Sequence, residues 1–280
     1  MKKVKVVKKE KDFSRYPLLI KKSPPDSRDW KLSRVLPKVE ILPRKTNNRE
    51  TAAPFRDQGP YPTCAAFTAA LVKYWQERKD IGLSELLSPW FVYANREDPN
   101  EDGMYMRDLM KILKSEGICL ERLAPYSSMG PLSGEAFTEA LNHRIENYAH
   151  VDSIEILKTA LFLNGPQFMA VPVYNYTERM WYQRSGDVLL GGHAMEILDY
   201  DDDERVFWYQ NHWKGFGDSN GRAKMSYDDY DLIWEFWSSV DAKSIPDPHP
   251  YPEPSWLDRN WGYLVAGAMV IGIILFIIFA

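Results

Sequence analysis

Apolar residues recur at helical spacing in three segments of the first half of the chain. The segments are residues 65–77, 104–116 and 154–163. Apolar positions three to four residues apart line one face of a helix, so each segment predicts a helix. Thr63 stands directly before the first segment and follows Pro60 and Pro62. A threonine in that place is typical of an N-cap, so we expect the first helix to begin at Cys64.

The second half of the chain shows a shorter period. Residues 166–176, 193–202, 205–213 and 221–230 are rich in β-branched and aromatic residues, and Gly, Asn and Asp clusters separate them. Such segments predict short antiparallel strands. A helical half followed by a β half, with a cleft between them, indicates an α+β fold.

The pattern changes twice after residue 244. Residues 245–256 read IPDPHPYPEPSW, with too many prolines for a helix or a central strand, and predict an extended spacer. Residues 263–280 read YLVAGAMVIGIILFIIFA, carry no charge, and as a helix would span roughly 27 Å, close to the thickness of a bilayer core. A buried core helix is the alternative, but apolarity on every side favours a single transmembrane helix. Four parts follow: a basic arm (1–22), a globular domain (23–244), a proline-rich linker (245–261) and a membrane anchor (262–280).

Charge and cysteine content narrow the classes of protein. The 280 residues hold 35 Lys and Arg against 39 Asp and Glu, a net charge of −4, and the basic start MKKVKVVKKEK is short and interrupted. A nucleic-acid surface needs basic residues clustered on a folded face, so we expect no nucleic-acid partner and a solvated arm. Two cysteines cannot form a disulfide framework.

The start of the chain shows no signal peptide, because its first apolar cluster, residues 16–20, is far shorter than an h-region. With the apolar end, this predicts a single-pass membrane protein whose domain lies in the cytosol or inside a virion. The lipid membrane would be one partner. Arg259 gives only a weak orientation signal.

Four polar residues fit one kind of chemistry. Cys64 is expected in a first helical turn, where the helix dipole favours the nucleophilic thiolate. His193 stands in GGHAMEILDYDD and Asn211 in WYQNHWKGFG, each beside a predicted strand. An imidazole can pair with the thiolate and later protonate a leaving amine, while an amide oxygen fixes the imidazole tautomer. Gln58, six residues before Cys64, could donate its amide to a developing oxyanion.

Three motifs in this order resemble those of the papain family of cysteine proteases. QGPYPTCAAF resembles the family's QGxCGSCWAF, GGHAMEILDY its GGHAVxIVGY, and NHWKGFGDSNGRAKM its NSWGxxWGxxGYxxI. His193 follows Cys64 by 129 positions and Asn211 follows it by 147, which also fits the family. The resemblance covers residues 24–230.

The resemblance implies a papain-like fold of two subdomains with 23–244 as its catalytic domain. It implies Cys64 as nucleophile, His193 as general acid and base, Asn211 as orienter of the imidazole and Gln58 as oxyanion donor. It also implies that Trp213 shields the imidazole–amide hydrogen bond beside the substrate, and that Gly103 pairs with a bound peptide backbone. No metal or organic cofactor is implied, and the oligomeric state stays open.

The chain departs from the family's pattern at four positions. Tyr61 stands where the family has a disulfide cysteine, Pro62 where it has glycine, and Ala65 where it has tryptophan. His212 replaces a serine; strand alternation directs it away from Asn211, and we expect it to be structural or exposed. The arm is also shorter than the family's inhibitory propeptide, so self-inhibition by a large prosegment is not expected.

The sequence thus predicts a membrane-anchored cysteine endopeptidase that acts on proteins or peptides through an acyl-enzyme. One alternative is a catalytically silent member that binds peptides or partners, motivated by the changes at Pro62 and Ala65. Another is an acyl transferase using the same residues, because an acyl-enzyme does not specify its acceptor. The anchor and the lack of disulfides suggest an unusual branch, such as one encoded by a large DNA virus.

Overall fold

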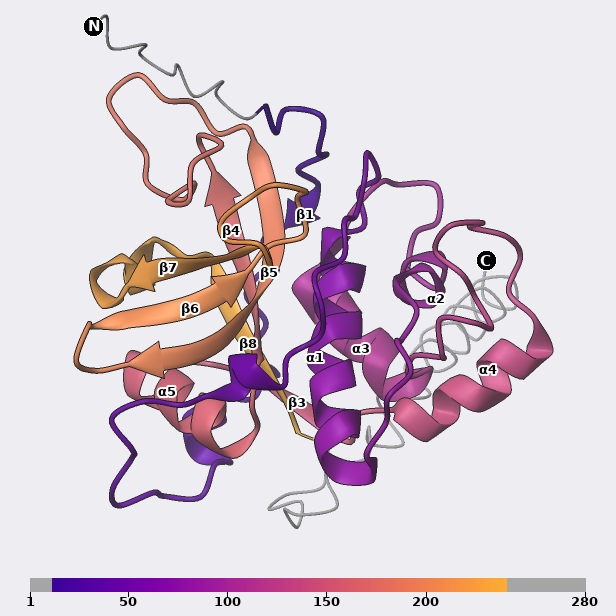
Figure 1. Cartoon of the computed structure of the whole chain (residues 1–280), viewed down its shortest axis with the longest axis horizontal. Helices are drawn as coiled ribbons and strands as arrows, with labels where there is room; N and C mark the ends of the chain where they lie inside the picture. The colour runs from indigo at the N-terminus through magenta and orange to yellow at the C-terminus, as the bar shows by residue number, and fades with distance from the viewer. Residues whose placement is uncertain (1–11, 241–280) are drawn as a thin grey trace, which may run out of the picture. The chain divides into compact units, whose positions relative to one another are not determined.

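The structure, a computed structural model, describes residues 12–240, which belong to one compact unit. Its helices are α1 (Cys64–Ile81), α2 (Pro89–Ala94), α3 (Met106–Ser115), α4 (Gly134–Ala140) and α5 (Ile154–Leu163). Its strands are β1 (Ile20–Lys21), β2 (Met104–Tyr105), β3 (Asn147–His150), β4 (Gln167–Val173), β5 (Gly191–Asp201), β6 (Val206–Gln210), β7 (Arg222–Ser226) and β8 (Glu235–Val240) (Figure 1). Short 3₁₀ turns occur at Leu32–Arg34, Asn48–Glu50, Leu141–His143 and Tyr227–Leu232.

The predicted linker, the predicted membrane anchor and the first 11 residues of the arm lie outside the described residues. Among helices within residues 12–240, none is long and apolar enough to cross a membrane.

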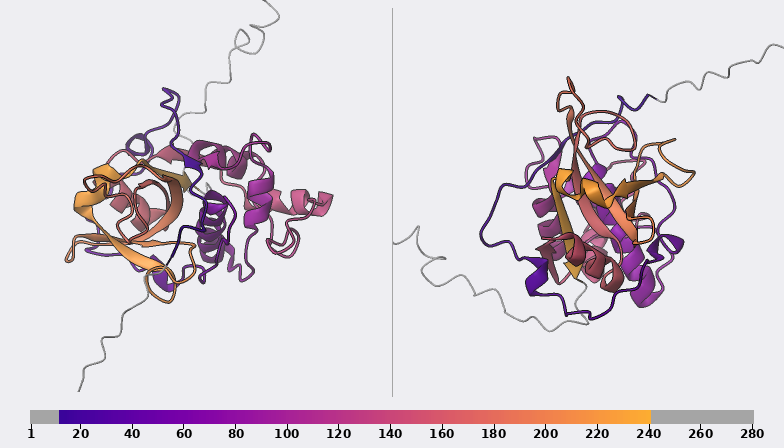
Figure 2. Two further views of the ribbon diagram at one scale, coloured as in Figure 1. Left: turned by 90° about the horizontal axis from the view of Figure 1, so that it is seen from above. Right: turned by 90° about the vertical axis from the view of Figure 1, so that its left-hand side faces the viewer.

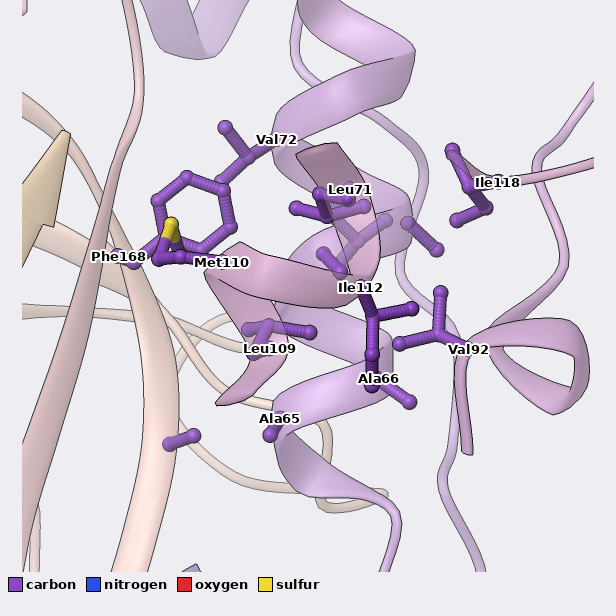
Figure 3. Close-up of a cluster of buried hydrophobic side chains, with 14 of the residues drawn as sticks. Ala65, Ala66, Leu71, Val72, Val92, Leu109, Met110, Ile112, Ile118 and Phe168 are labelled. Carbon is purple, nitrogen blue, oxygen red and sulfur yellow. The ribbon is translucent and has the colours of Figure 1, made fainter. Parts of the chain in front are cut away.

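Helix α1 is the centre of the helical half. It begins at Cys64 after Thr63, as the pattern predicted, although the Thr63 hydroxyl contacts the hydroxyl of Tyr126 at 2.7 Å instead of capping the helix. Every residue from Cys64 to Glu77 is buried. Figure 3 shows the reason: side chains of α1 are surrounded by apolar side chains of α2 and α3 and by Phe168 of β4.

The β half is one antiparallel sheet with the strand order β3-β8-β4-β5-β6-β7. Strands β4, β6 and β7 fall within predicted segments, whereas β5 begins two residues before its segment, at Gly191. Helix α5 matches its predicted bounds, because Ser153 accepts a hydrogen bond from the backbone N–H of Ile156 and caps its start. The end of the last predicted strand segment is instead the 3₁₀ turn at Tyr227–Leu232.

The two faces of the sheet at β4 and β5 pack against two separate hydrophobic cores. Ala170 and Ala194 pack with the residues of α1, whereas Met169 and Met195 pack with Leu157 and other residues of α5. Helices α1 and α5 therefore cover opposite faces of the sheet (Figures 1 and 2). This arrangement brings the beginning of α1 against β5, the strand that carries His193.

The described part of the arm runs between the two halves. Strand β1 pairs in parallel with β2 of the helical half, while Leu19 forms a bridge with Gly192 of β5. Phe13, Tyr16 and Ile20 are buried. The basic start, residues 1–11, for which a solvated arm was expected, lies outside the described residues; residues 12–22 pack apolar side chains against both halves.

Candidate active site

His193 and Asn211 meet on neighbouring strands. His193 is the third residue of β5, Asn211 directly follows β6, and His193 Nε2 lies 2.9 Å from Asn211 Oδ1. An amide oxygen only accepts hydrogen bonds, so the imidazole proton sits on Nε2. His193 Nδ1 has no hydrogen-bond partner and is the nitrogen left for a proton exchange.

Trp213 covers this pair. Its ring stacks on the imidazole of His193 with 4.4 Å between centroids, and neither side chain is exposed. The indole thus occupies the place expected of a shield, because it keeps water away from the imidazole.

Cys64 lies against strand β5, at the residue that follows His193. The pKa of its thiol reflects hydrogen bonds from the backbone of Ala194, which follows His193 on β5, and of Ile20 in the arm. Cys64 is 1% exposed. Burial raises the pKa of the thiol to about 11, and the backbone hydrogen bonds, including those of Ala65 and of Cys64 itself, only partly offset it.

Burial shifts the pKa of the His193 imidazole in the opposite direction. It lowers the pKa of His193 to about 3; the hydrogen bond to Asn211 opposes this shift and the charge of His212 adds to it. In the described state both Cys64 and His193 are therefore neutral. Burial therefore opposes the thiolate that the position at a helix start favours.

Hydrogen bonds to the backbone carbonyls of His212 and Tyr61 hold Gln58 in position. Its N–H donates to the carbonyl of His212 at 3.0 Å, and its side-chain Nε2 donates to the carbonyl of Tyr61 at 2.9 Å. A carboxamide has two donor hydrogens, so one remains available. The backbone N–H of Cys64 is also unused by α1, because the first turn of a helix leaves its N–H groups unpaired.

Two glycines let a backbone pass between the halves. Gly103 has φ +78°, and a Cβ there would lie 1.9 Å from the carbonyl oxygen of Leu19. A Cβ at Gly192 would lie 2.3 Å from the carbonyl oxygen of Ile20. Gly103 thus touches an extended backbone, as the resemblance implied for a bound peptide, but the backbone is that of the chain's own arm.

The arm closes the site on both sides of Cys64. Ile20 is 3% exposed and belongs to the same apolar cluster as Met104 and Ala194. At the other side Tyr16 stacks on Trp213 with 5.4 Å between centroids, and its hydroxyl donates to Asp57 at 2.8 Å. The reactive groups are therefore covered by residues of their own chain.

Within residues 12–240, the second cysteine and His143 are both buried. Cys119 is buried, and burial raises the pKa of its thiol to about 12. His143 contacts Glu77 and Glu139 at 3.1 and 2.8 Å. Across residues 12–240, no group of three or more His, Cys, Asp or Glu side chains could hold a metal ion.

Two buried residues, His212 and Glu196, lie near the site without having been predicted as part of it. His212, expected to be structural or exposed, is wholly buried, and its Nε2 lies 3.2 Å from Glu196 Oε2. Glu196 was not singled out at all. Its position inside the apolar run HAMEIL was the available signal, because a carboxylate on a buried strand requires a partner.

Comparisons with known proteins address the fold and the family resemblance of the chain. No protein-family model matches the chain. Over 223 residues the chain is 25% identical to an uncharacterized peptidase C1-like protein of Acanthamoeba polyphaga mimivirus, which covers 69% of this chain and 70% of that protein.

Solved structures of cysteine proteases share the fold. Xylellain, a cysteine protease from Xylella fastidiosa, matches with a TM-score of 0.70 and 24% identity over 82% of this chain and 97% of that chain. Procathepsin L 3 of the Tenebrio molitor larval midgut matches with a TM-score of 0.57 and 17% identity over 72% of this chain and 71% of that chain. Procathepsin B S9 of Trypanosoma congolense matches with a TM-score of 0.62 and 14% identity over 81% of this chain and 86% of that chain. The papain-like fold is confirmed, as is the resemblance to papain-like cysteine proteases.

Proposed function

We propose that the chain is a cysteine endopeptidase that hydrolyses peptide bonds through Cys64, His193 and Asn211, with Gln58 as an oxyanion donor. One observation carries the proposal: the imidazole bound to Asn211 leaves Nδ1 unpartnered, and the next residue of its strand, Ala194, contacts the Cys64 thiol through its backbone. The similarity to cysteine proteases in sequence and fold supports it.

The geometry assigns each residue a step. His193 Nδ1 accepts the proton of Cys64, and the thiolate attacks the carbonyl carbon of the peptide. The backbone N–H of Cys64 and the amide of Gln58 stabilise the oxyanion. The imidazolium then gives its proton to the departing amine, and water, deprotonated by the same imidazole, releases the acid product. Asn211 keeps Nε2 protonated throughout.

In the described state this enzyme is latent. Residues 13–21 cover Cys64 and Trp213, so a substrate cannot enter until they leave. Water that enters with the departing arm would restore the charged forms, because desolvation is the main cause of both pKa shifts.

Substitution of the reacting groups tests the function. Cys64→Ala and His193→Ala should each lower kcat/KM for a peptide roughly 10³-fold or more, because neither the nucleophile nor its base can be replaced by a neighbour. The matched control is Cys119→Ala, which removes the other thiol and should keep full turnover. Hydrolysis would be followed in the full-length chain after the arm is displaced, with circular dichroism to check folding.

The alternatives give different results in the same assay. The arm lies in the site as an extended strand, which favours a peptide-binding protein as the second candidate. Binding of peptides with no turnover in any variant would support it. An acyl transferase would consume the peptide but join the acyl group to an added amine, which mass spectrometry of the products would show.

The sequence pattern also supports a membrane-anchored enzyme. Residues 262–280 would form the anchor and lipid would be a partner, with the catalytic domain in the cytosol or inside a virion. The full-length chain should then remain in the membrane pellet after an alkaline carbonate wash. Replacing two central isoleucines of the segment by lysine should release the chain into the supernatant of the wash. If the unchanged chain already appears in that supernatant, the anchor is excluded.

A further inference from the structure

A second imidazole and a carboxylate lie directly beneath the proposed site. Glu196 is two residues after Ala194 on β5, and Thr68 is one helical turn after Cys64 on α1. His212 fills the space between them: its Nε2 is 3.2 Å from Glu196 Oε2 and 3.3 Å from Thr68 Oγ1. Glu196 is 1% exposed, and Thr68 and His212 are not exposed at all.

His212 is connected to three of the four residues of the proposed mechanism. It contacts Asn211 and Gln58 directly, and it reaches Cys64 through Thr68. Its backbone N–H donates to Asn211 Oδ1 at 2.6 Å, and its carbonyl accepts from the N–H of Gln58 at 3.0 Å. Its side chain contacts the hydroxyl of Thr68, which donates to the carbonyl of Cys64 at 3.1 Å. The ring also lies 6.4 Å from that of His193.

We propose that Glu196 and His212 are a positioning pair that sets the alignment of Cys64 with His193 and tunes the pH range of their proton exchange. The inference rests on the proposed cysteine-protease function. The pair joins α1 to the β half one layer below the reacting atoms, so it determines how the thiol on one half faces the imidazole on the other. Neither residue touches a substrate.

A purely stabilising role explains the pair poorly. A buried ion pair is often no more stable than apolar side chains of similar volume, whereas removal of one partner leaves a costly buried charge. The surrounding interface of α1 with β4 and β5 includes apolar residues such as Ala69 and Ala170. A polar pair in this position is therefore expected to serve geometry and charge.

The charges around His212 give the direction of the pH effect. Glu196 and His193 face it from β5, and Arg222 of β7 acts electrostatically on Glu196. From α1 it meets Thr68 and Phe67, which do not titrate in this range. Burial is the main cause of the lowered pKa of His193, and the charge of His212 adds to it, so removal of His212 should let the imidazolium persist to higher pH.

Three variants of the full-length chain separate the roles, each made with and without Ile20→Asp, which should displace the arm. His212→Gln keeps a hydrogen-bond donor for Glu196 and Thr68 but carries no charge. Glu196→Gln keeps the shape and removes the carboxylate. The double variant Glu196→Leu with His212→Leu replaces the pair by apolar side chains and avoids a lone buried charge. The readouts are kcat and KM for a peptide, the pH dependence of Cys64 alkylation by iodoacetamide, and the unfolding temperature.

The double variant should fold with an unfolding temperature close to that of the parent and lose about 10- to 100-fold in kcat, with little change in KM. His212→Gln should recover most of kcat, and the upper pH limit of the reaction should move higher. Glu196→Gln should lower kcat less than the double variant. A double variant or a His212→Gln variant with the parent's kcat and pH profile would overturn the proposal. If the parent has no turnover, the protease proposal fails, and unchanged alkylation profiles in all three variants would overturn the positioning proposal separately.

Discussion

Cys64 and His193 have pKa values that burial shifts in opposite directions. The pKa of the thiol is raised to about 11 and that of the imidazole lowered to about 3. A thiolate–imidazolium pair needs the reverse order, with the imidazole the more basic group. At the scale of single residues, the described site therefore holds the right groups in their unreactive forms.

This protonation state can be measured in the unchanged chain. With Cys119→Ala to leave one thiol, alkylation of Cys64 should be slow at pH 7 and should rise only as the pH approaches about 11. The rise reflects formation of the thiolate, which is the reacting form. A midpoint below pH 8.5 in this chain would show that the site is already open and charged.

The residues of the site differ in how far sequence could predict them. The positions of Cys64, His193 and Asn211 followed from short motifs at known spacing, since each role requires one residue type. The Glu196–His212 contact depends on the register of β5 with β6, which shifts between Ile197 and Asp199. An irregular register cannot be read from alternation, so the partner of His212 was not predictable.

At the scale of elements, a buried ionic contact joins α1 to α4 and the turn after it. His143 contacts Glu77 of α1 and Glu139 of α4. Burial alone would lower the pKa of His143, but the hydrogen bonds and charges of the two carboxylates outweigh it and raise the pKa. The contact therefore stabilises the fold most when His143 is protonated.

The sign of this effect gives a stability prediction. A histidine whose pKa is raised by folding contributes stability below its unfolded pKa near 6.5 and loses it as the pH rises through the folded value. His143→Gln should thus cost about 1–2 kcal/mol in urea unfolding at pH 5.5 and clearly less at pH 9. His150→Gln is the control: burial lowers the pKa of His150, so its variant should show the opposite trend with pH. Equal costs at both pH values for His143→Gln would contradict the contact.

The arm strand gives a second prediction at this scale. Ile20 is buried, whereas the neighbouring Leu19 is 38% exposed. Ile20→Asp places a charge in an apolar pocket and forfeits about 1.5–3 kcal/mol of burial, enough to raise the open population roughly 10- to 100-fold. Leu19→Asp adds the same charge at the more exposed position and should change peptide turnover little. Equal turnover in the two variants would show that the arm does not control access.

Local patterns predicted the elements whose signals are local. The cap at Ser153 and the apolar spacing fix α5, which matched its expected bounds. Strand β8 was missed because its Ser238 and Ser239 are buried through bonds to Asn164 and Gln76, partners far away in the chain. The position of the arm likewise depends on glycines about 80 and 170 positions away. Neither strand β8 nor the position of the arm therefore has a local sequence signature.

At the scale of the whole molecule, the arm connects the two halves that the site requires. Strand β1 bonds to β2 of the helical half, and its neighbour Leu19 bonds to β5 of the sheet. The same glycines that admit the arm would admit a substrate backbone. The molecule thus combines a protease-like fold with an arm that lies between its two halves, and the proposed activity requires that arm to leave.

The most direct test of this account is labelling of the full-length Ile20→Asp chain with a peptidyl epoxide, followed by mass spectrometry to locate the adduct. The account predicts an adduct on Cys64 that forms faster than in the unchanged chain, disappears in His193→Ala and persists in Cys119→Ala. An adduct on Cys119 alone, or none on a protein shown to be folded, would contradict the central claim that Cys64 and His193 form a reactive pair beneath the arm.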